Sequence, residues 1–305
     1  MLSALLVTLG LAVVAFTFVL FKAAWARGSV IPGPEAVAVG AVVNFFDTLG
    51  IGSFAPTLTW LKFRAKLPDR LIPCTMIVAC TLPTMLQAVI FLTLLGVHVD
   101  AVLLIAYAVA LLAGGLLGQR LVVRVRVWIV QAVVAAALLI AAALYALSNL
   151  HMMPVGGLAT ALPVPLMLVA VAASFVMGVL LNFGIGHYAP SLLMLSLMGM
   201  DPKLAFPIMA TGGALAAAVI SGRHVVAKVA DLRIAIGFLL GGVPGVLIAA
   251  FVVKDMPVEW LRWMVIVVVI YAATVMLRDA AKTFGQRSSG HAGDLALARA
   301  EGLTD

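Results

Sequence analysis

The string GAVVNFFDTLGIGSFAP at residues 40–56 has a shorter counterpart, GVLLNFGIGHYAP, at residues 178–190. Each copy lies within apolar sequence and combines a glycine pair with a closing proline. The closing prolines and the two that follow them keep a spacing of 134 residues: Pro56, Pro68 and Pro73 correspond to Pro190, Pro202 and Pro207. Two related halves, each with a glycine-interrupted apolar element, are typical of membrane transporters with internal repeats.

The composition excludes a soluble domain. Hydrophobic residues make up 65% of the chain and charged residues 10%, and the mean hydropathy is +1.22, which leaves too little polar surface for a protein in water. Stretches of about 20 apolar residues, the length that crosses a bilayer as a helix, occur at 2–21, 71–96, 99–118, 127–148, 204–221, 234–252 and 259–277. A β-barrel would show shorter, alternating segments. The sequence therefore predicts an all-α polytopic membrane protein.

The net charge of +7 does not indicate nucleic acid, because the basic residues are spread over the short connections between apolar segments. In these positions they act as orientation signals. Cys74 and Cys80 are six residues apart and fall on different faces of one helix, a spacing that does not favour a metal site. No metal, cofactor or catalytic residue is expected.

Residues 34–63 are too many for one span and too few for two. Basic residues flank this element on both sides: Lys22 and Arg27 precede it, and Lys62, Arg64, Lys66 and Arg70 follow it. Both ends are therefore expected on the cytoplasmic side, and the element is predicted to be a re-entrant hairpin. Residues 162–198 are expected to turn back in the same way from the external side. Since 164–182 is long enough to cross by itself, a full crossing there remains the alternative.

One hairpin and three spans give each repeat an odd number of crossings, so the two repeats are expected to be inverted. The predicted order is an N-terminal transmembrane helix and loop (1–33), a first repeat (34–148), an external loop (149–161), a second repeat (162–278) and a polar cytoplasmic tail (279–305). In this topology the N-terminus is external and the C-terminus cytoplasmic. Of all lysines and arginines, only Lys203, Lys254 and Arg262 then lie outside.

The two breaks are the expected ligand site, because a broken helix at membrane depth survives only where protein or a water-filled cavity covers it. Half-helices that start at the glycines would hold Pro56 and Pro190 in their first turns. Their N–H groups and positive dipole ends favour a small anion. The candidate substrate-binding residues are Asn44, Thr48, Gly50, Gly52, Ser53, Phe54, Asn182, Gly184, Gly186, His187 and Tyr188. Helix packing is the alternative role for the glycines, and helix C-caps for the asparagines.

Two titratable residues at the breaks are candidates for proton coupling. Asp47 lies in the four residues that only the first copy contains, and acids at membrane depth are usually functional. His187 is the second candidate. The alternatives are that Asp47 caps the hairpin turn and that His187 is a hydrogen-bonded structural ring. Two weaker sets of candidates could line a path: Thr75, Thr81, Thr84 and Gln87 in 71–96, and Thr211, Gly212 and Gly213 in 204–221. The alternative is that the polar residues among them bond to their own backbone, as they often do in membrane helices.

The paired strings, Asn44 to Pro56 and Asn182 to Pro190, resemble those of the sulfite exporter TauE/SafE family, also called the toluene sulfonate uptake permease family. The resemblance covers most of residues 34–277. It implies a carrier of the bacterial inner membrane for small anions, often sulfur-containing, such as sulfite, thiosulfate, sulfoacetate or other organosulfonates, coupled to the proton gradient. The substrate class comes from this resemblance, whereas the residues alone indicate a small anion at a broken-helix site.

The function expected from these observations is secondary anion transport by alternating access. The expected partners are the small anion, a proton or else sodium as coupling ion, and the lipid bilayer; no nucleic acid is expected, and a homo-oligomer is left open. An anion channel or a non-transporting membrane subunit is the alternative. An enzyme is disfavoured, because neither Gly-x-Ser-x-Gly nor His-Glu-x-x-His occurs and only one acid lies deep in an apolar element.

Overall fold

The computed structural model describes residues 2–49, 53–65, 67–68, 71–94, 99–121, 127–150, 158–182 and 185–257, together with 259–281 apart from 261–262, 265, 268, 272, 276 and 279. The named helices in these ranges are α1 (Leu2–Ala26), α2 (Pro34–Thr48), α3 (Phe54–Phe63), α4 (Ile72–Leu94), α5 (Ala101–Leu121), α6 (Val127–Asn149), α7 (Val164–Leu181), α8 (Tyr188–Leu197), α9 (Pro202–Val226) and α10 (Leu232–Asp255). The predicted helix 259–277 is described only in part. Most of the predicted external loop, at 151–157, and most of the predicted tail, at 282–305, lie outside the described residues.

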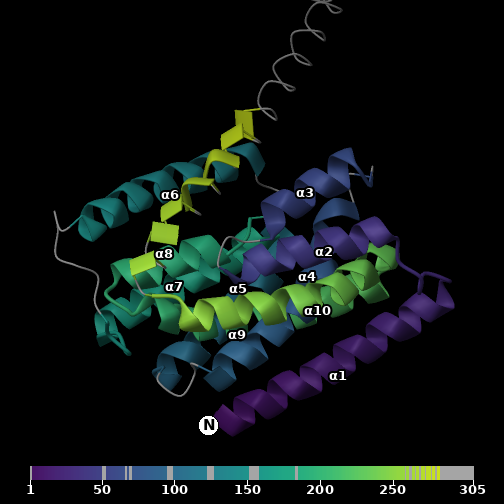
Figure 1. The fold of residues 1–305 in the computed structure, drawn as a ribbon, viewed down its shortest axis with the longest axis horizontal. Helices are drawn as coiled ribbons and strands as arrows, with labels where there is room; N and C mark the ends of the chain where they lie inside the picture. The colour runs from purple at the N-terminus through teal and green to yellow at the C-terminus, as the bar shows by residue number, and fades with distance from the viewer. Residues whose placement is uncertain are drawn as a thin grey trace, which may run out of the picture.

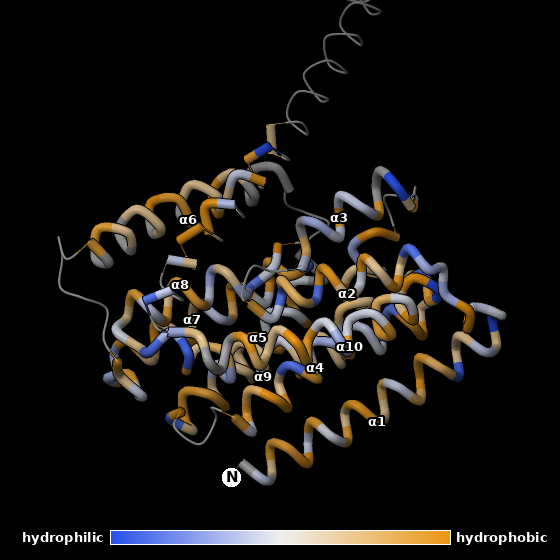
Figure 2. The backbone as a smooth tube through the Cα atoms, in the orientation of Figure 1, coloured by the Kyte–Doolittle hydropathy of each residue, from blue (hydrophilic) through white to orange (hydrophobic). Residues whose placement is uncertain are grey.

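Six of the described helices are long and apolar enough to cross a membrane: α1, α4, α5, α7, α9 and α10. Hydrophobic residues predominate along α1 and α10, for example (Figure 2). The chain is therefore an all-α polytopic membrane protein. The other described helices include α2, α3 and α8, which have 15, 10 and 10 residues. At 1.5 Å per residue they are about 22, 15 and 15 Å long, well short of a hydrocarbon core of about 30 Å.

The first glycine-containing element turns back on itself. Glu35, in the first turn of α2, accepts hydrogen bonds at its carboxylate from Arg64 Nε at 2.8 Å and from Trp60 Nε1 at 3.1 Å. Trp60 lies in the last turn of α3 and Arg64 directly follows that helix. The hydrogen bonds from Trp60 and Arg64 lower the pKa of Glu35. The start of α2 and the end of α3 therefore lie together, as in a hairpin.

The second element has the same geometry. Ala159, before α7, donates its N–H to the Gly199 carbonyl at 3.2 Å and accepts the Asp201 N–H at 3.1 Å. Gly199 and Asp201 follow α8, so both ends of the α7–α8 element lie together. The 18 residues of α7 are long enough to cross a membrane, but these contacts favour a chain that turns back over one that crosses fully.

The two hairpins start from opposite ends of the helix bundle (Figure 1). Arg27, just before the first hairpin, donates to the Val225 carbonyl at 2.7 Å, at the C-terminal end of α9. The second hairpin starts beside Asp201, which is the N-cap of the same helix. Because α9 has 25 residues, these two points are about 37 Å apart. This is the arrangement expected for inverted repeats, although the orientation in the membrane stays a prediction.

Each hairpin packs against a helix of the other half. The α2 helix lies against α10, and α7 lies against α5, while α4 and α9 pair in the centre. Glycines allow the first two contacts: a Cβ on Gly241 would stand 1.8 Å from the Val37 carbonyl oxygen, and one on Gly114 would stand 1.9 Å from that of Phe175. Gly114 and Gly241 therefore serve close helix packing.

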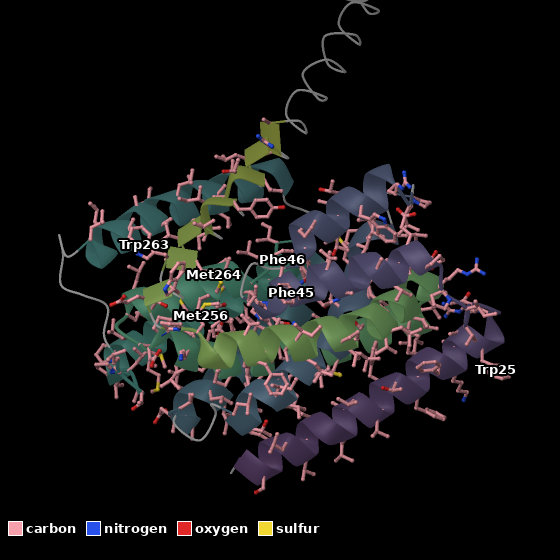
Figure 3. All side chains as sticks on the ribbon, in the orientation of Figure 1. Trp25, Phe45, Phe46, Met256, Trp263 and Met264 are labelled. Carbon is pink, nitrogen blue, oxygen red and sulfur yellow. The ribbon has the colours of Figure 1, made fainter. Side chains whose placement is uncertain are left out.

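The α1 helix lies at the edge of the bundle (Figure 1), where it packs mainly on α9 and α4. One stripe of α1 is buried, and it contains Leu9, Phe16, Leu20 and Ala24. Exposed tryptophans lie at opposite ends of the molecule (Figure 3), among them Trp25, 80% exposed, and Trp263, 45% exposed. Exposed tryptophans at both ends are typical of the two membrane interfaces.

The packing of α2 on α10 leads to a first testable prediction. The substitution Gly241→Ala forces the two backbones apart, and overpacking of this kind lowers the free energy of unfolding by about 1–3 kcal/mol. The matched control is Gly222→Ala, because a Cβ there meets no atom within 4 Å. The melting temperature of the full chain in detergent should fall for Gly241→Ala and should stay the same or rise for Gly222→Ala. Equal melting of the two variants would contradict the packing described here.

Candidate functional site

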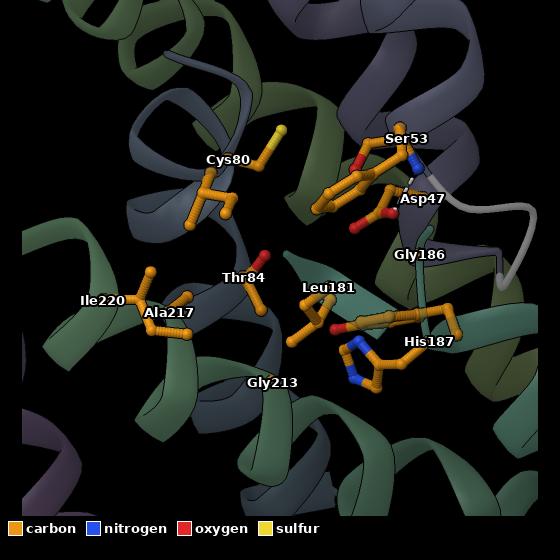
Figure 4. A pocket seen from close by; sticks show the side chains of 13 residues that line it. Asp47, Ser53, Cys80, Thr84, Leu181, Gly186, His187, Gly213, Ala217 and Ile220 are labelled. Carbon is orange, nitrogen blue, oxygen red and sulfur yellow. Dashed lines mark hydrogen bonds between the residues drawn. The ribbon is translucent and has the colours of Figure 1, made fainter. Parts of the chain in front are cut away.

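A cavity of about 40 Å³ lies between the two breaks (Figure 4). A buried water needs about 10–15 Å³, so the cavity has room for about three waters or one compact ligand. The breaks contribute Asp47, Ser53 and Phe54 from the first hairpin and Gly186, His187 and Tyr188 from the second; Ile77, Cys80 and Thr84 of α4, Leu181 of α7, and Gly213, Ala217 and Ile220 of α9 complete the lining. Six of the predicted substrate-site or coupling residues are thus brought together.

The N-terminus of α3 is already occupied by a carboxylate. Ser53 is the N-cap of α3, and its N–H donates to Asp47 Oδ1 at 2.6 Å. Pro56 lies in the first turn of the helix, where its missing N–H leaves no bond unmade. Asp47 is 3% exposed. The predicted alternative role of Asp47 as a cap of the hairpin turn is therefore present in the structure. Gly50 and Gly52, between the two helices, lie outside the described residues.

The N-terminus of α8 is formed by the corresponding residues of the second copy. His187 is the N-cap, and Tyr188 is the first residue of the helix. His187 Nε2 lies 3.1 Å from the Met209 carbonyl oxygen of α9. Because a carbonyl only accepts, His187 donates this bond. The ring also lies close to Gly213, where a Cβ would stand 2.7 Å from His187 Cε1. Gly184 lies outside the described residues.

A chain of hydrogen bonds connects the two breaks through α4. Gln87 Nε2 donates to Asp47 Oδ2 at 3.0 Å, and the Tyr188 hydroxyl donates to Gln87 Oε1 at 2.6 Å. Gln87 is fully buried. From the sequence Gln87 was only a weak candidate, because many polar residues of membrane helices bond to their own backbone. Its role as a link between the halves depends on the tertiary structure.

The two half-helices are anchored differently one turn further on. Ser191 of α8 bonds to the Tyr107 hydroxyl, to Met177 Sδ and to the carbonyl of His187. The corresponding residue of α3 is Thr57, whose hydroxyl is buried and has no hydrogen-bond partner among the described residues. The first break is therefore held chiefly by Asp47, and the second by several side chains.

Three predicted substrate residues do not line the cavity. Asn44 Nδ2 donates to the Gly40 carbonyl at 2.8 Å, and Thr48 donates to the Asn44 carbonyl at 2.7 Å. Asn182 Nδ2 donates to the Gly115 carbonyl of α5 at 3.0 Å. These contacts join residues within helices or between packed helices.

Sequence reasoning did not assign several apolar residues of the cavity, among them Ile77, Leu181, Ala217 and Ile220. No local pattern distinguishes them from the rest of the apolar helices. Cys80, for which the spacing from Cys74 disfavours a metal site, also lines the cavity, and no cluster of at least three metal-ligating residues occurs in the described parts of the chain. Of the weaker path-lining candidates, Thr84 and Gly213 line the cavity, whereas Thr75, Thr81, Gln87, Thr211 and Gly212 are not among its lining residues.

Positive electrostatic potential in the cavity comes from backbone N–H groups rather than from lysine or arginine side chains. Among the residues for which the structure gives burial, no lysine or arginine is buried, and Asp47 is the one buried acid. The N-termini of α3 and α8 supply N–H groups and the positive ends of two helix dipoles. Such an arrangement attracts an anion without a buried positive charge.

One family comparison agrees with the resemblance seen in the sequence. The model of the family described as Sulfite exporter TauE/SafE matches residues 166–302, from within α7 through α8, α9 and α10 and beyond. The match agrees with the resemblance of the second copy at residues 178–190, and the first copy lies outside the matched range. No curated protein and no solved structure gives a match.

The link through Gln87 leads to a prediction about stability. The substitution Tyr188→Phe removes the hydroxyl that donates to Gln87 and leaves a buried amide oxygen unpaired, which costs about 1–3 kcal/mol. The control is Tyr271→Phe, since Tyr271 is 45% exposed and exposed substitutions usually change stability by less than about 0.5 kcal/mol. We expect the melting temperature to fall for Tyr188→Phe and to stay unchanged for Tyr271→Phe. Equal melting temperatures of the two variants would mean that the bond from Tyr188 to Gln87 is absent.

Proposed function

We propose that this chain, whose second half matches the sulfite exporter TauE/SafE family, is a secondary transporter that moves a small anion across the bacterial inner membrane. The proposed substrate is sulfite, thiosulfate or a small organosulfonate. The family is one of membrane transporters, and the chain is a multi-pass membrane protein. The substrate, the direction of transport and the coupling ion belong to this proposal.

A single observation carries the proposal: two half-helix N-termini, one from each hairpin, lie at the same closed cavity. Half-helices that point their N-termini at a midplane site are a common way in which transporters bind anionic groups. The volume of about 40 Å³ suits a compact anion. The apolar residues at the far side, including Ile77 and Ile220, would contact a short apolar part of an organosulfonate.

Alternating access follows from the way in which the halves are combined. The hairpins start from opposite ends of the bundle, and each packs on a helix of the other half. If one hairpin with its partner helix moves against the other pair, the cavity opens toward one end of the bundle and then toward the other. Asp47 and His187 line the cavity and are the proposed sites of a coupling proton; sodium remains the alternative coupling ion.

The first test is transport by the purified full chain in proteoliposomes. A carrier should exchange labelled sulfite, thiosulfate or sulfoacetate for unlabelled anion inside, and should saturate. Because Ala217 faces the cavity, Ala217→Phe should reduce exchange at least tenfold, whereas Val219→Phe, on an exposed position of the same helix, should leave it nearly unchanged. Conductance without exchange would instead identify a channel, and neither activity with any of the three anions would overturn the proposal.

The chain also contains a natural reporter of the cavity, Cys80. In a Cys74→Ser background, a small thiol reagent should modify Cys80 slowly, because the side chain is 4% exposed and must wait for the cavity to open. Substrate anion should protect Cys80 from modification. In the converse Cys80→Ser variant, modification of Cys74 should not respond to substrate. Labelling of Cys80 that substrate does not change would place the anion elsewhere.

A further inference from the structure

We propose that the Asp47 carboxylate is a built-in competitor of the substrate anion. When Asp47 is deprotonated, its carboxylate accepts the Ser53 N–H at the α3 N-terminus. When Asp47 is protonated, this N–H becomes available to the substrate anion, so that each anion binds together with one proton. The inference rests on the proposed function, since it assumes that the cavity is the anion site.

The competition follows from the bond between Ser53 and Asp47. The N–H of an N-cap residue at the start of a half-helix is a donor that an oxyanion would use, and here a carboxylate oxygen accepts it at 2.6 Å. Asp47 reaches this position from the four-residue insertion that the second copy lacks. At the α8 N-terminus the N-cap is His187, which donates to the Met209 carbonyl. Only the first break therefore carries an anion of its own.

Protonation of Asp47 also changes the donors of the second hairpin. In the structure, where Asp47 accepts hydrogen bonds, Gln87 donates to Asp47 and accepts from Tyr188. A protonated Asp47 is a donor through its O–H, so the Gln87 amide turns over, accepts that bond with Oε1 and donates with Nε2 to the Tyr188 oxygen. The Tyr188 hydroxyl hydrogen is then free to point into the cavity, which Tyr188 lines. One proton thus frees a donor from each hairpin, Ser53 N–H and Tyr188 O–H.

The charge balance explains why a competitor is useful here. Two negative charges within a cavity whose lining contains no lysine or arginine repel each other strongly in a medium of low dielectric constant. When a substrate monoanion binds together with a proton, Asp47 becomes neutral, and the cavity still holds one negative charge. When no substrate is bound, the deprotonated Asp47 carboxylate accepts the Ser53 N–H, so this donor is not left unpaired.

Few other titratable groups face Asp47. Cys80 comes from α4, and His187 and Tyr188 come from the second break. On α3 the charged Arg64 lies at the far end and pairs with Glu35. On α10, which packs against the other side of α2, Arg233 donates to the Ile31 carbonyl, before α2 starts. The cavity-lining residues of α9 are Gly213, Ala217 and Ile220. His187 is therefore the one rival source of pH dependence that needs a control.

The first experiment measures protons taken up by the wild-type chain in detergent when it binds methanesulfonate, whose charge does not change between pH 5.5 and 8. Above the pH at which Asp47 loses its proton in the free protein, we expect uptake to approach one proton per bound anion. Affinity should fall about tenfold for each pH unit above the pH at which Asp47 loses its proton, as one linked proton requires. Binding without proton uptake would overturn the proposal, whatever the variants do.

The same measurements on variants identify the residue that takes up the proton. Asp47→Asn is a neutral counterpart of protonated Asp47 and should bind methanesulfonate with no proton uptake and with less than twofold change in affinity across this pH range. In proteoliposomes it should retain anion exchange but lose accumulation driven by a proton gradient. The control Glu35→Gln, an exposed acid of the same helix, should behave like the wild type.

Two outcomes would overturn the assignment to Asp47. The first is proton uptake that persists in Asp47→Asn, and the second is an affinity of Asp47→Asn that still falls about tenfold for each pH unit; loss of the uptake in His187→Gln would then assign the proton to His187. Failure of the proposed function looks different, because the wild type would then neither bind nor exchange methanesulfonate, sulfite or thiosulfate. If Asp47→Asn does not fold, the proton count of the wild type still decides the proposal.

Discussion

Broken helices within hydrocarbon must have their free backbone groups covered, and the rest of this structure depends on that constraint. Each unpaired N–H or C=O at membrane depth is costly, and lipid offers no partner. Here the half-helices α3 and α8 begin beside a closed cavity, with α4 and α9 on its other sides. Asp47 accepts one of the free N–H groups at the start of α3. The same covering that makes the breaks tolerable also forms a pocket at which the N-termini of α3 and α8 lie.

The halves are interlocked rather than placed side by side. Because glycines allow α2 to touch α10 and α7 to touch α5 at backbone distance, each hairpin is fixed to a helix of the other half. The α4 and α9 helices pair in the centre of the bundle and also line the cavity.

The two copies differ where the chemistry is placed. The first copy has an insertion that carries Asp47, whereas the second has His187 at its N-cap and Tyr188 behind it. Gln87 of α4 has Ser221 as its counterpart in α9 at the spacing of the repeat, and Ser221 bonds to Thr81 instead. Likewise Ser191 is bonded on several sides while its counterpart Thr57 is not. A symmetric backbone thus supports an asymmetric polar network.

The sequence by itself determined the membrane class, the two glycine breaks and the residues nearest to them, because hydropathy, length and proline spacing are local properties. It also identified Asp47, Ser53, Phe54, Gly186, His187 and Tyr188, all of which line the cavity. It could not separate these from Asn44, Thr48 and Asn182, which bond to helix carbonyls, since both groups stand next to the same breaks. Only the tertiary structure placed Gln87 between Asp47 and Tyr188 and brought Ile77, Cys80 and Ala217 to the cavity. The physical reason is that which apolar or amide side chain faces a cavity depends on how helices far apart in the chain rotate and pack, and no local pattern records that rotation.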